Sequence, residues 1–298
     1  MKIFIIDPRL RKFLLALKYY IVGIYERFTS EHLMIHGASL AFGVMLCLIP
    51  WLVLIFSAFG FFLSTEESMD LVEETIGQFI MLPGYEEEIK QQIQTRLDDL
   101  VNYRQTAGIV GLVGVLWIAT FLFGAARTIL NEIFKVTVTK NIFVQKLRDF
   151  QVLIIMGILF LVTLFGSTLI YVVKQIVFDH IEILEAVWIP GSLPIIIGFV
   201  LTWTMFLVLY RFLPFVKLSF DVLVVASTIS AILWEIAKYF FGLYLTNFSN
   251  ITRIYGALTV LAVTALWLYY SSIVFLLGAT IGQLYRERKQ MLKKGNVA

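Results

Sequence analysis

The sequence has few charged residues and only one cysteine. Charged side chains make up 15% of its 298 residues and hydrophobic ones 59%, whereas a soluble globular domain has roughly 25% charged and about 45–50% apolar residues. A water-soluble fold of this size has too little interior to bury so many apolar side chains. Cys47 has no second cysteine with which to form a disulfide within the chain. These scarcities exclude an ordinary soluble domain and a disulfide-stabilised one.

The motifs of several common enzyme classes are also missing. The sequence contains no Gly-rich phosphate loop ending in Lys-Ser/Thr and no Gly-x-Ser-x-Gly elbow. His32 and His36 are four residues apart, but the glutamate that a zinc-protease helix carries between its two histidines is absent. No other cluster supplies the remaining ligands that a metal would need. We therefore expect no metal, no cofactor and no enzymatic activity.

Long apolar runs are what the sequence does contain. A helix of about 20 mainly apolar residues crosses a hydrocarbon core roughly 30 Å thick, and the short alternating strands of a membrane barrel do not occur. We predict an all-α fold, a polytopic membrane bundle with six transmembrane helices. These helices are expected at Ala38–Leu63, Ala107–Ala126, Phe150–Val173, Pro194–Leu213, Val222–Leu243 and Ala257–Ile281.

The basic residues predict the orientation of the bundle, because Lys and Arg resist translocation across the membrane. They gather before the first segment, after the second, between the fourth and fifth, and in the tail, so both termini are predicted to be cytoplasmic (N-in and C-in). The opposite connections hold only five basic residues: Lys90, Arg96, Arg104, Lys174 and Arg253. They are rich in acidic residues instead, including Glu66, Glu67, Asp70, Glu73, Glu74, Glu86, Glu87, Glu88, Asp98 and Asp99.

The chain accordingly divides into three predicted parts. Residues 1–36 form a basic amphipathic cytoplasmic helix, residues 37–281 the transmembrane domain, and residues 282–298 a basic cytoplasmic tail. The segment 64–106 is predicted to be an external insertion, a helical hairpin broken at Pro83-Gly84. A hairpin that takes part in function and a solvated helical cap without a ligand are both compatible with it. The N-terminal helix is expected to lie at the membrane interface beside anionic headgroups.

Ionisable residues inside apolar segments are the best pointers to a site, because each costs at least about 2.5–3.5 kcal/mol at the bilayer centre. Glu235 and Lys238 lie three residues apart in the fifth segment and share one helical face. One interpretation is a polar patch on a central cavity that binds a charged headgroup or relays protons. The other is a self-neutralised structural pair, with Lys238 extending toward the interface.

Three more residues are candidates. Arg127, at the end of the second segment, and Arg211, at the end of the fourth, are predicted to bind a phosphate or, alternatively, to anchor the helices at the interface. Pro50 lies in the middle of the first segment, where the missing amide predicts a helix kink. Bent helices often line cavities but also occur in plain bundles.

Two regions resemble the YihY/BrkB family of bacterial inner-membrane proteins. Residues 37–60, GASLAFGVMLCLIPWLVLIFSAFG, are similar to its first span, with the Ala-Ser-Leu-Ala start and the mid-span proline. Residues 240–279 are similar to its closing signature: Tyr244, Asn247-Phe248, Ile254-Tyr255-Gly256, Trp267-Leu268-Tyr269 and Leu277-Gly278-Ala279. The family usually has Glu and Asn where this chain has Thr280 and Gly282, so a role that depends on that carboxylate is in doubt here.

The resemblance implies a multi-pass protein of the bacterial cytoplasmic (inner) membrane. The family is linked by name to virulence and serum resistance, some members have been suggested to move lipids or lipopolysaccharide precursors, and many carry an old ribonuclease BN label. The residues argue against that label, because the carboxylate-rich loop is predicted to face outside, where no cytoplasmic RNA would meet it.

Our first hypothesis is a transporter or flippase-like protein that handles lipids or envelope precursors, with membrane lipids as partners, anionic headgroups or lipopolysaccharide precursors among them. Nucleic acid is not an expected partner. The alternative is a non-catalytic scaffold for an envelope complex, which would have protein partners, and a homo-oligomer is compatible with either. A ribonuclease ranks third.

Overall fold

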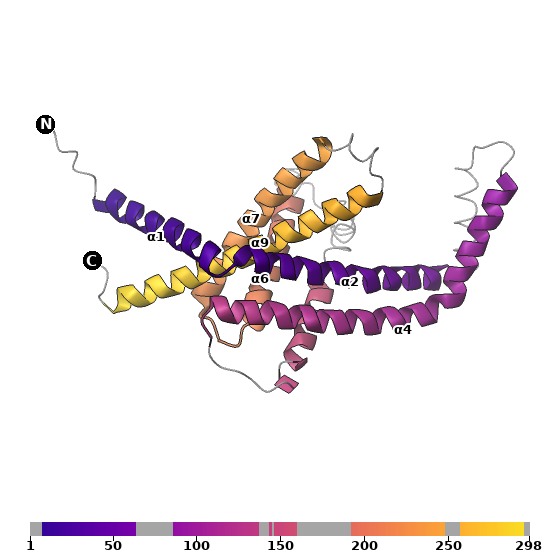
Figure 1. Ribbon diagram of the computed structural model, residues 1–298, viewed down its shortest axis with the longest axis horizontal. Coiled ribbons are helices and arrows are strands. Elements are labelled where there is room, and N and C mark those ends of the chain that lie inside the picture. The colour runs from indigo at the N-terminus through magenta and orange to yellow at the C-terminus, as the bar shows by residue number, and fades with distance from the viewer. Residues whose placement is uncertain are drawn as a thin grey trace, which may run out of the picture. The chain divides into compact units, whose positions relative to one another are not determined.

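A computed structural model describes residues 8–63, 86–136, 143–144, 146–159, 192–247 and 257–294, and the regular structure within these ranges is α-helical (Figure 1). This confirms the all-α prediction for the described part of the chain. Residues 146–159 are helical in addition to the labelled helices. The labelled helices are α1 (Pro8–Ser30), α2 (Leu33–Phe62), α4 (Glu86–Ile133), α6 (Ser192–Phe212), α7 (Phe220–Asn247) and α9 (Ala257–Lys293).

Within the described residues, four helices are long and apolar enough to cross a membrane. They are found at Leu33–Phe62, Val101–Ile133, Phe220–Tyr244 and Thr259–Lys293. A shorter apolar helix, Ile196–Phe212, falls on the fourth predicted span, and part of the third, Phe150–Val173, lies outside the described residues. Large apolar side chains such as Ile109 and Trp117 point outward, as expected where the solvent is lipid. The six crossings and the N-in, C-in orientation stay predictions.

The second predicted span is part of a longer helix, and its predicted membrane boundary stays a prediction. Helix α4 runs without interruption from Glu86 to Ile133 over 48 residues, so the second half of the expected external insertion is continuous with the span. The stretch 86–107 contains no Pro and no Gly, and nothing in it stops a helix once started. The first half of the insertion, with Pro83-Gly84, lies outside the described residues.

The chain forms two compact units. One comprises Gly43–Phe121 and the other comprises Met1–Phe42 together with Leu122–Ala298. In the first, α2 packs closely on α4 through glycines: a Cβ added to Gly111 would lie 3.0 Å from the Leu54 backbone nitrogen, and one added to Gly114 would lie 2.8 Å from Pro50 Cβ. Helix α2 continues through Pro50. The kink expected there stays a prediction.

In the second unit, α7 packs against both α6 and α9, and the C-terminal half of α1 contacts α9 (Figure 1). The core is a stack of aromatic rings, in which Tyr210 and Phe275 are nearly parallel with their centroids 5.2 Å apart and Phe206 stacks on both. Tyr210 is fully buried, and its hydroxyl donates to the Phe275 carbonyl at 2.6 Å. This packing of α6, α7 and α9 is the frame on which the candidate sites lie.

Candidate functional site

The two charged residues predicted inside a span form an ion pair on α7. The Lys238 Nζ lies 2.7 Å from the Glu235 Oε1, and the two side chains remain 43% and 32% exposed. Glu235 is fourteen residues after Asp221, which places it about 21 Å further along the helix axis. The pair therefore lies well inside the apolar helix and is not sealed in the core.

A group of aromatic rings from three helices begins on the helical face of α7 that carries Lys238. Trp234 and Phe241 lie four residues before and three after Lys238, so the three share a helical face. The Trp234 ring meets the Trp267 ring of α9 edge-on at 5.2 Å and the Phe206 ring of α6 at 6.0 Å. Phe241 also contacts Trp267, at 4.5 Å. The geometry thus combines an anion, a cation and a wide apolar wall, which suits a molecule with a charged head and an apolar body.

Arg127 makes its contacts with other residues of the protein. It is almost completely buried, and its guanidinium forms an ion pair with Asp149, which is buried as well. Its Nε donates to the Leu213 carbonyl at 3.1 Å, and the Phe215 ring lies under the guanidinium with its centroid 5.4 Å from Cζ. Because Asp149 neutralises this charge inside the fold, Arg127 is better suited to hold the loop after α6 than to bind a headgroup.

Arg211 serves the same loop. Its Nη1 donates to the Leu218 carbonyl at 3.5 Å, and Asn131 on α4 accepts the Phe215 amide at 2.9 Å. Glu235 lies fifteen residues beyond Phe220, where α7 begins, or about 22 Å along the helix axis. The structure therefore brings Glu235 and Lys238 together and places Arg127 and Arg211 at a distant end of the bundle.

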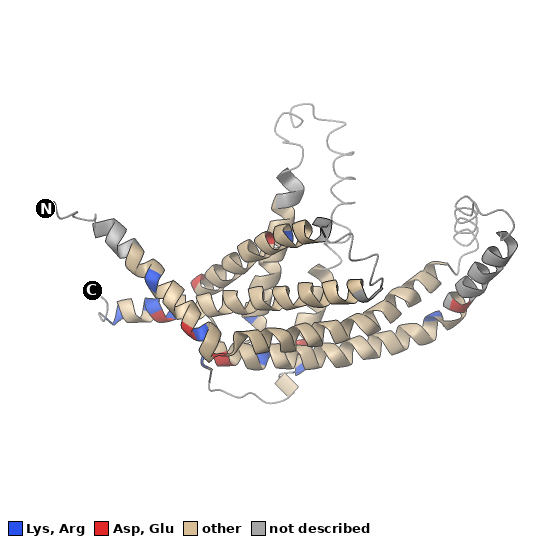
Figure 2. Cartoon of the chain, turned by 45° about the horizontal axis from the view of Figure 1, so that its top comes forward, with Lys and Arg blue, Asp and Glu red and all other residues tan. Residues whose placement is uncertain are grey.

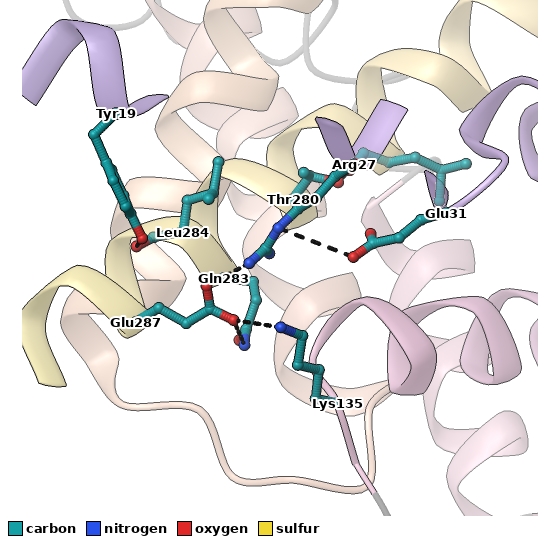
Figure 3. A network of polar contacts seen from close by, with 9 residues as sticks. Tyr19, Arg27, Glu31, Lys135, Thr280, Gln283, Leu284 and Glu287 are labelled. Carbon is teal, nitrogen blue, oxygen red and sulfur yellow. Dashed lines mark hydrogen bonds and ion pairs between the residues drawn. The ribbon is translucent and has the colours of Figure 1, made fainter. Parts of the chain in front are cut away.

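A second polar cluster, the α1–α9 network, joins the ends of three helices (Figure 3). Glu287 on α9 forms an ion pair with Arg27 of α1, and Lys135, just after α4, reaches the same carboxylate at 3.0 Å. Gln283, one turn earlier on α9, donates to it at 3.0 Å. Glu31 lies 3.9 Å from the Arg27 Nε. In Figure 2 the blue and red segments that mark charged residues gather toward the ends of α1 and α9, while most of the helices are tan.

Several atoms of this network lack a hydrogen-bond partner among the described residues: Arg27 Nη1, Glu31 Oε2 and Gln283 Oε1. Burial raises the pKa of the Glu31 carboxyl above its usual range, although Arg27 and Lys135 act in the opposite direction. The unpaired oxygen and the raised pKa agree, since both disfavour the charged form of Glu31.

Lys135 is held in an unusual backbone conformation. Its φ is 52°, the left-handed region that glycine normally fills at the end of a helix. The Val136 amide donates to the Asn131 carbonyl at 2.8 Å and the Lys135 amide to the Glu132 carbonyl at 3.0 Å, the pair of bonds that defines a Schellman ending. This turn closes α4 and positions the Lys135 ammonium beside Glu287.

The sequence pattern pointed to none of the residues in the α1–α9 network. One signal was present: Glu287 is the lone acid in the basic run Arg286-Glu287-Arg288-Lys289. Its partner Arg27 could not be identified from this pattern, because it is 260 residues away in the sequence. Asp149 is likewise the only carboxylate between Glu132 and Asp179, and Arg127 is its partner. In the described residues, no three His, Cys, Asp or Glu side chains group as metal ligands would.

Comparison with known proteins gives a consistent answer. A family model described as "Virulence factor BrkB" matches residues 24–297. A "UPF0761 membrane protein" from Psychromonas ingrahamii is 24% identical over 93% of this chain and 91% of its own length. Another, from Mannheimia succiniciproducens, is 24% identical over 94% of each chain. A third, from Alkalilimnicola ehrlichii, is 28% identical, and the match spans 56% of its length. No solved structure matches the chain.

Proposed function

Because this chain belongs to the BrkB family of membrane proteins, we propose that it is a transporter or flippase-like protein that moves lipids or lipid-linked envelope precursors across the bacterial cytoplasmic membrane. The substrate class is an amphiphile with a charged headgroup. In the proposed orientation both termini are cytoplasmic, and the lipid enters beside α7.

One observation carries the proposal: the Glu235–Lys238 pair lies about 21 Å along α7 from Asp221, yet each side chain is about one-third exposed or more. An ionisable residue at membrane depth is costly unless it is paired or faces a polar path. An ion pair with a purely structural role could be fully buried by its neighbours without losing that role. Left partly open, it offers opposite charges to the phosphate and amine groups of a passing headgroup.

The neighbouring rings support the same reading. Trp234 and Phe241, which share the helical face of Lys238, pack with Trp267 into an apolar group, along which the acyl chains of the lipid would move. In this mechanism Lys238 attracts a phosphate, Glu235 an amine or a hydroxyl, and the pair re-forms when the headgroup leaves. The reaction involves no covalent step, so we expect RNA incubated with the purified protein and Mg²⁺ or Mn²⁺ to stay intact.

The test uses the full-length protein in proteoliposomes that contain fluorescent phospholipid, with dithionite reduction reporting movement between leaflets. The double variant Glu235→Gln/Lys238→Gln should lose movement while keeping its expression and melting temperature. The matched control is Asp221→Asn/Lys289→Gln, which removes another ion pair from the same two-helix frame, outside the proposed path. Unchanged movement in the first variant, or equal loss in both, would refute the site.

A further inference from the structure

Helix α1 has two unlike faces, and the polar one is turned toward the protein. Tyr19 donates to the Leu284 carbonyl at 3.4 Å, and Arg27 forms its ion pair with Glu287. Gly23 packs closely against the Leu284 side chain: a Cβ atom added to Gly23 would lie 2.7 Å from it. All these contacts are with α9 (Figure 3).

The outward face is apolar instead. Leu14, Leu17, Ile21 and Tyr25 recur three or four residues apart and are exposed, Tyr25 to 74%. Leu15 and Val22 are exposed beside them. An arc of six large apolar side chains is more than a helix in water normally leaves uncovered. Among the side chains that the structure describes, Lys18 is the one cation within this arc.

The contacts also show at which level of the bundle α1 lies. Helix α9 has 37 residues, about 55 Å of helix, whereas crossing the hydrocarbon core requires roughly 30 Å. Its apolar sequence ends before Gln283, and α1 packs against the part that follows, where Arg288 lies over the Tyr20 ring with its Cζ 5.7 Å from the centroid. Helix α1 therefore contacts α9 beyond the apolar part of that helix, where its sequence becomes polar.

We propose that the outward face of α1 binds the surface of the lipid bilayer, with its apolar arc in the boundary between acyl chains and headgroups and with a preference for anionic phospholipid. Only two residues separate the end of α1 from the beginning of the apolar helix α2, which keeps α1 next to lipid. Lys18 lies among the apolar residues with a stem long enough to reach a headgroup. Arg9, Arg11 and Lys12 occupy the first turns of the same helix. This inference is independent of lipid transport.

A second copy of the chain is the competing occupant of this face. Such an interface would bury Lys18 among apolar side chains, and α1 has no exposed partner for it on the same arc, since Glu26 lies at its edge. A lipid phosphate can pair with the Lys18 ammonium while that charge stays at the membrane surface and is not buried. The charge pattern therefore favours lipid.

The experiment places one fluorescent label at a time on the full-length protein in nanodiscs, after Cys47→Ser has removed the native thiol. NBD is attached at Ile21→Cys and, as references, at Ile109→Cys on the apolar surface of α4 and at Lys294→Cys after α9, both of which are exposed. Spin-labelled lipids report contact with the bilayer, and iodide reports contact with water. We expect the label at 21 to behave like that at 109: quenched by lipid and protected from iodide.

Each other result overturns the proposal. Iodide quenching equal to that at 294 would place α1 in water. Protection from both quenchers, with energy transfer between differently labelled copies, would show that a second protein covers the face. For the headgroup preference, spin-labelled phosphatidylglycerol should quench the label at 21 more than spin-labelled phosphatidylcholine at equal mole fraction, by about threefold to fivefold. Lys18→Gln should reduce that difference, and equal quenching by both lipids would disprove the preference.

Discussion

The hydroxyl oxygens of Tyr210 and Ser230 lie 2.7 Å apart in a fully buried seam between α6 and α7. Gly278 of α9 closes the seam from the other side. A Cβ there would overlap the Ser230 hydroxyl and come within 2.7 Å of the Tyr210 hydroxyl and 3.0 Å of the Ala226 carbonyl. Three helices thus meet at one glycine, with no room for a methyl group.

The first prediction follows from that seam. Gly278→Ala should destabilise the protein by at least about 2 kcal/mol, because overpacking a rigid core typically costs 1–3 kcal/mol. Gly242→Ala is the control, since no described atom lies within 4 Å of its Cβ position, and it should be neutral or mildly stabilising. Melting in detergent, followed by size-exclusion chromatography, measures both. The substitution at 278 should cost less in a Ser230→Ala background; equal costs would show that the seam relaxes freely.

The second prediction concerns the buried pair of Arg127 and Asp149. Removing one partner leaves an uncompensated buried charge, so Arg127→Met should destabilise by about 3–5 kcal/mol. The double variant Arg127→Met/Asp149→Leu removes both charges and should recover much of that loss. If Arg127 instead bound a lipid phosphate as its main role, Arg127→Met would weaken lipid movement more than it lowers the melting temperature. Measuring both quantities on the same preparations separates the two roles.

These two cases also show what the sequence could and could not reveal. The apolar runs predicted the positions of α2, α7 and α9, because an apolar run long enough to cross a membrane can be recognised from the sequence alone. The Glu235–Lys238 pair was predictable since its members are three residues apart on one helix. The partners of Arg127 and Glu287 were not, because those contacts join helices far apart along the chain. The sequence did not predict that one helix continues from the insertion into the second span. Acidic residues indicate exposure to solvent, and they do not indicate where a helix ends.

The third prediction tests the backbone at Lys135. With φ at 52°, any residue except glycine is strained there, by roughly 1–2 kcal/mol. Lys135→Gly and Lys135→Ala both remove the ion pair with Glu287, but only glycine relieves the backbone. The alanine variant should therefore be the less stable of the two by about 1 kcal/mol, as measured by thermal melting. Equal stability would mean that α4 can end in another conformation without cost.

The last prediction is a dependence of stability on pH that originates at Glu31. Burial raises the pKa of this carboxyl, so the folded state binds its proton more tightly than the unfolded state does. The contribution to stability is therefore fully present below the ordinary pKa, near 4.5, and is lost as the pH rises through the raised value. Glu31→Gln keeps a neutral side chain at every pH. It should be more stable than the parent protein at pH 7, and the difference should disappear at acidic pH.

Arg27 has the opposite effect. Its guanidinium lies 3.9 Å from the Glu31 carboxylate and stabilises the charged form of that group. Burial is the largest of the effects on the pKa of Glu31 and exceeds the opposing effect of Arg27. The sign of the difference in melting temperature between Glu31→Gln and the parent at pH 7 tests this order. Glu26→Gln is the control: it removes an exposed carboxylate of α1 five residues earlier and should leave the melting temperature nearly unchanged at both pH values. A Glu31→Gln variant that melts below the parent at pH 7 would show that the ion pair with Arg27 outweighs burial, and that Arg27 holds both Glu31 and Glu287 in their charged forms.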